Sequence, residues 1–395
     1  MQSTRRGFLK TGLAGVSAGA IGTGAVLADS GGLAAAASVV ADSAVVPFYG
    51  THQAGIATPA QNYLQFAAFD VQTDSAAELQ KLLKDWTNAA DAMSTGKTIG
   101  AVNTGTRPPV DTGEGLGLSP AQLTVTFGFG PTLFTSNGKD RFGLAKHRPG
   151  PLVDLPAFAG DALQPAIGGG DLGIQVCAND PQVAFHAIHN LIRMAETIAS
   201  ARWVLAGFGR TGNSRHQSLP RNLMGFQDGT SNIKVEDTFS MKNFVWASEP
   251  ASPAWMRGGS YLVARRIQIA LALWDDTGLE GQEQTIGREK VTGSLLATIP
   301  PSSHIELSRP ASNGGQEILR RGYSYTDGID SSGDTAVGLM FLCYQSDPRK
   351  QFIPVQHKLA GKDALNLYVT HIGSSVFACP PGAAKGGYVG EALLG

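Results

Sequence analysis

Apolar runs and amphipathic stretches alternate along the first half of the chain, in an order typical of proteins that mix helices and strands. Three apolar runs have the length of strands: residues 63–71, 123–127 and 172–177. Residues 75–93 show the period of an amphipathic helix, and a second helical pattern follows Asp180 and Pro181. An aspartate cap before a proline explains that start, because proline lacks the amide proton that would go unsatisfied there.

The second half of the chain repeats this order. Residues 261–273 predict a strand followed by a helix from about Gly278, and residues 339–343 predict a strand that leads to Asp347 and Pro348. The spacing Asp-Pro-x-x-x-Phe occurs in both halves, so Asp347 is expected to cap a helix as Asp180 does. The repeat predicts an α+β fold of two ferredoxin-like domains, duplicated β-α-β-β-α-β units with antiparallel sheets and helices packed outside them.

The amino terminus has the features of an export signal. Arg5 and Arg6 precede a Phe-Leu-Lys step, and residues 11–28 are weakly apolar and rich in glycine and alanine. So many glycines lower the hydropathy below that of a membrane anchor. We expect export in the folded form by the twin-arginine machinery, to the periplasm or outside the cell, without stable membrane insertion. Two cleavage sites remain open, after residue 28 and within residues 35–37.

The expected organisation is an export signal with a flexible amino terminus over residues 1–45 and two domains, over 46–212 and 213–395. The boundary between the domains is expected near residues 208–220. The chain that follows the signal, about 360 residues, exceeds the usual size of one domain. Long segments without periodicity separate the predicted elements, and loops of this length in a compact domain are usually functional or covering. They are residues 102–120, 139–170, 213–256 and 301–335.

Composition narrows the range of partners. The formal net charge of −1 gives no electrostatic signature of nucleic acid or anionic membrane binding. The three cysteines are widely spaced, which indicates neither a disulfide framework nor a zinc site. Two of them lie in apolar strand-like runs, where a buried free thiol is the simpler interpretation. The motif Cys-x-x-Cys-His is absent from the sequence, so any haem would be bound without thioether links.

Three side chains in the long segments have the chemistry that a haem iron needs to cleave hydrogen peroxide. His304 offers an imidazole ligand, and Asp228 offers a carboxylate that can move a proton between the peroxide oxygens. Arg320 offers a cation for the leaving oxygen. Each also has a simpler interpretation: His304 as a satisfied histidine, and Asp228 as the cap of a turn before Gly229.

Four segments carry a family resemblance. Residues 225–232 resemble the Gly-x-x-Asp-Gly signature of the dye-decolourising peroxidases, and residues 303–305 with 318–323 resemble their haem segment. Residues 47–56 resemble the start of the exported twin-arginine subgroup, and residues 338–345 the strand beneath the haem. The resemblance runs from about residue 45 to the end of the chain. It implies one non-covalent haem b in the second domain, with hydrogen peroxide and small-molecule reductants such as dyes or phenolics as substrates.

The resemblance implies that His304 is the axial ligand of the haem iron. His52 also lies in a matching segment, but that segment is the amino-terminal one in the family and not the ligand segment. His186 and His189 stand three residues apart on a predicted helix and could form a metal pair. One exposed and one packed histidine is the simpler interpretation of that spacing.

The resemblance also implies that Asp228 is the distal acid-base residue and that Arg320 stabilises developing negative charge. The adjacent Arg321 is the alternative, but the family pattern places the distal residue first in the Arg-Arg pair. Only one of the two can reach the iron, because successive side chains of an extended segment point to opposite faces. Arg321 would then meet a haem propionate or an acidic surface group, and Arg309 is another propionate candidate. Because the proton acceptor must be ionised and an unperturbed aspartate has a pKa of about 3.9, an acidic activity optimum is expected.

Further residues would support the cofactor. Four of them would contact the haem or narrow the pocket to peroxide: Gly229, Thr230, Leu339 and Phe341. A carboxylate on the far nitrogen of His304 would increase electron density at the iron. Asp363 is preferred for this role over Asp347, which the repeat assigns to a helix cap.

Bulky substrates would have to give up electrons at the protein surface if the pocket admits only peroxide. Aromatic residues of the second half could relay them: Trp246, Trp255, Trp274, Tyr323, Tyr325 and Tyr344. Three functions stay open at this point. They are a haem peroxidase, a haem-handling deferrochelatase that releases iron from haem in bacterial iron uptake, and a non-catalytic binding module. Asp228 and Arg320 favour the peroxidase, because carriage of haem needs neither a proton shuttle nor a charge clamp.

Overall fold

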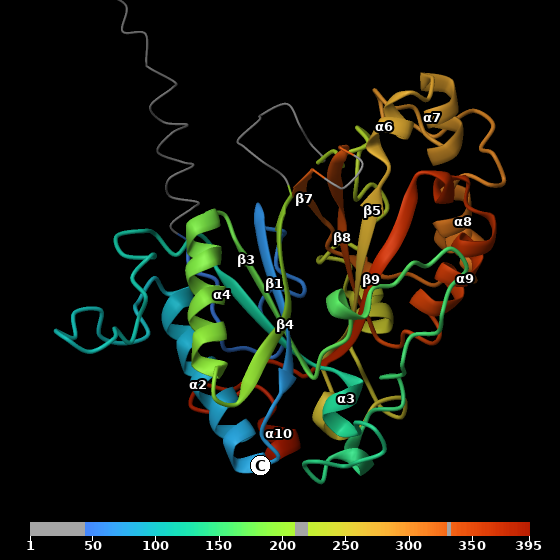
Figure 1. Ribbon diagram of the computed structural model, residues 1–395. Coiled ribbons are helices and arrows are strands. Elements are labelled where there is room, and N and C mark those ends of the chain that lie inside the picture. Colours follow the sequence, from blue (N-terminus) through green and yellow to red (C-terminus); the bar gives the residue numbers. More distant parts are fainter. Residues whose placement is uncertain (1–43, 210–219, 330–332) are drawn as a thin grey trace, which may run out of the picture.

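The computed structural model describes residues 44–209, 220–329 and 333–395 (Figure 1). The predicted export signal and most of the predicted domain boundary therefore lie outside the described residues. Within the described ranges, no helix is both long enough and apolar enough to cross a membrane.

The first half of the chain forms a four-stranded antiparallel sheet in the order β2-β3-β1-β4. The strands are β1 (Tyr63–Val71), β2 (Thr124–Phe129), β3 (Leu172–Ala178) and β4 (Ala199–Phe208). Helices α2 (Ala76–Ser94) and α4 (Pro181–Ala195) cover one face of this sheet. The predicted cap is confirmed, because the Asp180 carboxylate accepts hydrogen bonds from the main-chain N–H groups of Gln182 and Val183.

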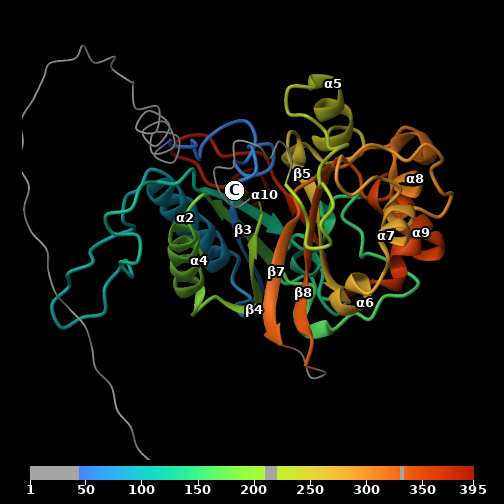
Figure 2. The ribbon, with the colours of Figure 1, turned by 90° about the horizontal axis from the view of Figure 1, so that it is seen from above.

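The second half forms a matching antiparallel sheet, in which β8 pairs with β5 on one side and with β6 and β7 on the other, and β9 lies beyond β5. The strands are β5 (Ser260–Ile269), β6 (Leu319–Arg320), β7 (Tyr323–Ile329), β8 (Thr335–Gln345) and β9 (Val369–Cys379). Its principal helices are α6 (Leu271–Asp275), α7 (Leu279–Ile286), α8 (His304–Ser308) and α9 (Phe352–Lys362). The predicted pair of ferredoxin-like units with antiparallel sheets is thus confirmed. Figure 2 shows α2 and α4 on one side of the molecule and α7, α8 and α9 on the other, with the strands between them.

Two predicted boundaries in this half are wrong. The strand predicted over 261–273 ends at Ile269, because the chain turns directly into the short helix α6. The helix predicted to start at Pro348 begins at Phe352. The Asp347 carboxylate accepts the main-chain N–H of Arg349 and pairs with its guanidinium, so it caps a turn that precedes the helix. The Gln351 side chain binds the main-chain N–H of Asp347 and two distant carbonyl groups, and these contacts hold this turn outside the helix.

The two sheets are joined at both sides. Phe129 of β2 pairs with Ala378 of β9, and Phe208 of β4 pairs with Ser324 of β7. The described strands therefore form one continuous sheet, and the pairing of β5 with β8 closes it into a ring. The inner faces of the two halves pack together in an apolar core that includes Phe66, Tyr323, Met340, Tyr344 and Phe377.

Other short elements connect this framework. The described residues also form the short α-helices α3 (Pro131–Phe134), α5 (Thr238–Ser240) and α10 (Glu391–Leu394). The long segment that precedes β3 crosses to the second half, where the N–H groups of Ala162 and Gln164 donate to the carbonyls of His371 and Ile372 in β9. All three cysteines are free and buried, which confirms the expectation for the two in apolar strand-like runs. Most of the proposed aromatic relay residues are buried in the core, and Trp246 is half-buried.

Candidate functional site

A cavity of about 260 Å³ opens between the outer face of the second sheet and the helices α8 and α9. Strands β5 and β8 contribute apolar side chains to one wall, and the segment around Asp228 forms another. Eight residues predicted from the sequence to act on or hold the cofactor line this cavity. They are Asp228, Gly229, Thr230, His304, Arg309, Arg320, Leu339 and Phe341.

His304 is held by a carboxylate through one ring nitrogen. It stands at the start of α8, and its Nδ1 lies 2.6 Å from Oδ2 of Asp363, where α9 ends. The other oxygen of Asp363 accepts the main-chain N–H of Leu365, and the N–H of Ala364 donates to the carbonyl of Ser302. A carboxylate acceptor requires the proton on Nδ1, which leaves the lone pair of Nε2 available. The Nε2 atom has no hydrogen bond within the described part of the chain, so it can bind a metal in the cavity.

Asp228 and Arg320 form a second pair of polar side chains that line the cavity. Nη1 of Arg320 lies 3.7 Å from Oδ1 of Asp228, and about a third of each side chain is exposed. Asp228 follows a hairpin turn at residues 221–227 and donates its main-chain N–H to the carbonyl of Pro220. Arg320 belongs to β6, which pairs with β8. A carboxylate and a guanidinium so arranged can move a proton and stabilise an anion on one small molecule.

Alternation along the strands explains which side chains face the cavity. Leu339 and Phe341 of β8 line it, whereas Met340 and Leu342 between and beside them pack into the core between the sheets. This outcome agrees with the predicted cavity wall. It follows from the two-residue period of a strand.

Arg321 points away from the cavity, as alternation predicts, but its predicted partners are wrong. It is buried between the two sheets, where its guanidinium donates to the carbonyls of Thr58 and Pro59 and to the side chain of Gln61. These partners belong to the segment before β1. Arg321 is therefore a structural link between the halves and does not reach a propionate or an acidic surface group.

Two arginines besides Arg320 give the cavity positive charge. Arg309 pairs with Glu306 on α8 and is 40 % exposed. Arg288 was missed by the sequence reasoning because it lies in no recognisable motif. Its Nη1 donates to the carbonyl of Gly293, but its buried Nε has no hydrogen-bond partner among the described residues. Burial and the nearby charge of Arg320 lower the pKa of Arg288, so an anion in the cavity would be a favourable partner.

His371 of β9 is a second residue that sequence reasoning did not assign to the cavity. Burial, followed by the charge of Arg265, lowers its pKa to about 4. The Asp161 carboxylate, from the first half of the chain, binds Arg265 at 2.5 Å and lies 3.9 Å from Nδ1 of His371. This wall of the cavity therefore holds a neutral imidazole at neutral pH. No local pattern in the sequence brings these three distant residues together.

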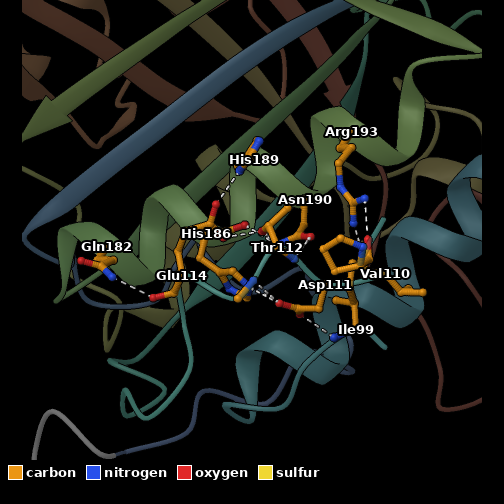
Figure 3. Close-up of polar contacts among 12 residues, drawn as sticks. Ile99, Val110, Asp111, Thr112, Glu114, Gln182, His186, His189, Asn190 and Arg193 are labelled. Carbon is orange, nitrogen blue, oxygen red and sulfur yellow. Dashed lines mark hydrogen bonds and ion pairs between the residues drawn. The ribbon is translucent and has the colours of Figure 1, made fainter. Parts of the chain in front are cut away.

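The other candidate histidines lie elsewhere. His52 stacks on Trp246 at 3.6 Å between ring centroids and donates from Nδ1 to the carbonyl of Gly258. His186 and His189 do not form a metal pair, since each binds a carboxylate of its own, Asp111 or Glu114 (Figure 3). Within the described residues, no group of three or more histidine, cysteine or acidic side chains could hold a bare metal ion.

Comparison with known proteins finds the same family in both halves of the chain. Residues 53–209 match the family described as Dyp-type peroxidase, N-terminal, and residues 219–384 match Dyp-type peroxidase, C-terminal. Together these matches span most of the chain.

Individual relatives extend over nearly the full length. A protein of Yersinia pestis named deferrochelatase is 37 % identical over 372 residues, which cover 88 % of this chain and 84 % of the relative. The structure of ferric DtpA from Streptomyces lividans is 38 % identical with a TM-score of 0.82, and covers 89 % of this chain and 98 % of its own. A DyP-type peroxidase from Streptomyces coelicolor is 38 % identical with a TM-score of 0.83, and covers 90 % and 98 %.

Proposed function

This chain belongs to the Dyp-type peroxidase family, and from that premise we propose that His304 binds the haem iron while Asp228 and Arg320 act on hydrogen peroxide. The chain is a peroxidase, and haem is the cofactor of its family. The observation that carries the assignment of residues is their presence around one cavity. An imidazole with an available Nε2 shares that cavity with a carboxylate and a guanidinium 3.7 Å apart.

The cavity fits haem b by the chemistry of its walls. Haem is a flat, largely apolar group with two carboxylates, and its iron takes an imidazole nitrogen. The apolar side chains of Ile267, Ile269, Leu339 and Phe341 suit the macrocycle. Arg309 and Arg288 would face the carboxylates, and the unpaired Nε of Arg288 suits an anionic partner. Haem, when bound, would supply an iron centre and the electrons needed to cleave the oxygen–oxygen bond of peroxide.

Side chains of the protein transfer the proton and stabilise the charge during cleavage of peroxide. Asp228 accepts the proton of one peroxide oxygen and returns it to the other oxygen, which leaves as water. Arg320 stabilises the negative charge that develops on the leaving oxygen. Asp363 keeps the Nδ1 of His304 protonated and increases the electron density that Nε2 offers. Dyes, phenolics or other one-electron donors would then restore the resting enzyme.

We further propose that the chain is exported by the twin-arginine route to the periplasm or outside the cell. The support is Arg5 and Arg6 before a weakly apolar stretch. A fusion of residues 1–45 to a reporter tests this. Export that is lost when both arginines become lysine would support it, and export that persists would contradict it.

Release of iron from haem is a second candidate function, because relatives 37 % identical are named deferrochelatase. The pair of Asp228 and Arg320 favours the peroxidase, since holding or demetallating haem requires no group that moves a proton between peroxide oxygens.

The visible spectrum of the haem-loaded protein, before and after one equivalent of hydrogen peroxide, distinguishes the two functions. A change in the Soret band within seconds, followed by return to the starting spectrum when a donor is added, would support the peroxidase. A spectrum that is indifferent to peroxide, with iron-free porphyrin released under reducing conditions, would support the deferrochelatase.

A further inference from the structure

We propose that Asn232 is a positioning residue that sets the separation between Asp228 and Arg320. This inference rests on the proposed function of that pair. Asp228 and Arg320 come from segments far apart in the sequence. The chain between them is too long to fix the distance between their side chains. The structure must therefore fix it by contacts between the two segments, and Asn232 provides them.

Asn232 binds both main-chain groups of Arg320. Its Nδ2 donates to the carbonyl oxygen of Arg320 at 2.8 Å, and its Oδ1 accepts the main-chain N–H of Arg320 at 2.8 Å. This is the pairing that a neighbouring strand would offer, made by one side-chain amide. The main-chain N–H of Asn232 donates to the carbonyl of Gly229 at 3.2 Å, which closes the turn directly after Asp228. The amide is thus tied to the proton-moving residue through one short turn.

Strand β6 needs such a partner because it is only two residues long. One of its sides pairs with β8, where Leu319 faces Tyr344 and Arg320 faces Cys343. The Asn232 amide occupies the other side at Arg320. Ile233, the next residue, is buried in the core between the two sheets and anchors the turn to the framework.

The ion pair itself is poorly suited to define this geometry. The 3.7 Å between its charged atoms exceeds the usual length of a direct hydrogen bond, and both side chains are partly exposed. Exposed pairs of this kind are weak and screened by salt. The two hydrogen bonds of Asn232 act on the main chain of Arg320, so they fix where its side chain starts. Asn232 does not line the cavity, and its effect must reach peroxide through Asp228 and Arg320.

The test compares haem-loaded wild type with Asn232→Ala and Asn232→Asp. The first variant removes both hydrogen bonds, and the second keeps the acceptor but turns a carboxylate oxygen toward the carbonyl of Arg320. Asn243→Ala is the matched control, because the exposed Asn243 side chain donates to the carbonyl of Phe239 within one short helical segment and does not line the cavity. Haem content, the ferric spectrum and the second-order rate constant with peroxide are measured for each.

We expect haem content and the ferric spectrum of the Asn232 variants to match wild type while the rate constant with peroxide falls by at least about tenfold, since small misplacements of reacting groups are costly. The control should keep the wild-type rate. An unchanged rate in both loaded Asn232 variants would overturn the inference. Loss of haem in both variants would overturn it too, since the amide would then support the cofactor cavity and not the geometry of the pair.

A double-mutant cycle separates positioning from a general structural effect. If Asn232 acts through the pair, Asn232→Ala should change the rate by less than about twofold when Asp228→Asn is already present. An equal fold-loss in both backgrounds would overturn the inference. Failure of the proposed function is distinguishable, because wild type itself would then not react with peroxide.

Discussion

Asp363 contacts His304 with one carboxylate oxygen and caps the following helical turn with the other. Its Oδ2 lies 2.6 Å from Nδ1 of His304, and its Oδ1 accepts the main-chain N–H of Leu365 at 2.9 Å. The carboxylate is 3 % exposed and the imidazole 34 %. A buried carboxylate fixed at both oxygens holds the ring in one orientation and one tautomer. The orientation of the His304 ring in the cavity is therefore set by a residue 59 positions away in the sequence.

Replacement of Asp363 by Asn should weaken the ligand without removing it. The amide carbonyl can still accept from Nδ1, but the negative charge is lost, and so is the electron density that it sends to the iron. We expect a higher iron reduction potential and a loss of about 10- to 100-fold in reactivity or haem affinity. Spectroelectrochemistry measures the potential. A potential equal to that of wild type would contradict the role of Asp363.

Removal of the His304 side chain should abolish iron ligation by the protein. In His304→Gly the ferric spectrum should be lost or grossly altered, and added imidazole should restore it by occupying the space of the missing ring. His147→Ala serves as a control, because His147 is exposed and does not line the cavity. A wild-type spectrum in His304→Gly without imidazole would show that another residue binds the iron.

Replacement of Asp228 or Arg320, to which we assign the action on peroxide, should slow the reaction with peroxide to different extents. Asp228→Asn removes the proton acceptor and should lower the second-order rate constant with peroxide by about 10²- to 10⁴-fold. Arg320→Leu removes the cation and should lower it by about 10²- to 10³-fold. Stopped-flow spectroscopy of the haem-loaded variants measures both. Rates within the error of wild type would exclude the corresponding role.

Arg321→Leu is the matched comparison for Arg320→Leu, because the two neighbours face opposite sides of the chain. It leaves the carbonyl of Thr58 and the side chain of Gln61 without their donor in the buried core. We expect the free energy of unfolding to fall by about 1–3 kcal/mol. The peroxide rate of the folded, loaded variant should stay close to that of wild type. Chemical denaturation and stopped flow together check this, and a large fall in rate at unchanged stability would be contrary to it.

Acid should detach the loop before β2 from helix α4. Figure 3 shows Asp111 and Glu114 of this loop facing His186 and His189 of the helix. Burial raises the pKa of Asp111, but hydrogen bonds from His186 and from the main-chain N–H groups of Ile99 and Gly113 outweigh it and hold the pKa below its usual 3.8. A carboxyl whose folded pKa is depressed stabilises the fold above its usual pKa, and this stabilisation is lost as pH falls through the folded value.

Hydrogen exchange at the amide of Ile99 reports this contact. Exchange should accelerate as pH falls below about 4, after correction for the intrinsic rate. Asp111→Asn should raise it already at neutral pH, while leaving the peroxide rate unchanged because the loop lies outside the cavity. Equal protection in wild type and Asp111→Asn at neutral pH would argue against the contact.

Much of the fold could be predicted because its signals are local. The helix start at Asp180 and Pro181 depends on a side-chain cap and on a missing amide proton, and two adjacent residues supply both signals. The same pattern at Asp347 failed, because the Gln351 side chain binds carbonyls of Phe244 and Glu317 that no local pattern reveals. Closure of the two sheets into a ring was not predicted either, since single pairs such as Phe129 with Ala378 leave no periodic signature.

The residues of the candidate site likewise fall into those that short motifs predict and those that only the fold reveals. His304, Asp228 and Arg320 stand in short motifs, and all three line the cavity. Their roles remain predictions. Arg288 and His371 reach the cavity only through the folding of distant segments, so no motif marks them. The opposite orientations of Arg320 and Arg321 followed from strand alternation, whereas the partners of Arg321 depend on how the first half packs on the second.

Closure of the ring changes which strand edges another molecule could reach. Each half taken alone would end in two strands with an unpaired side, β2 and β4 in the first and β9 and β7 in the second. A free row of N–H and C=O groups is a template on which a strand of another molecule can add. Here the open sides of one half lie against those of the other, at Phe129 with Ala378 and at Phe208 with Ser324. Either half expressed by itself would therefore expose unpaired strand edges that meet each other in the intact chain.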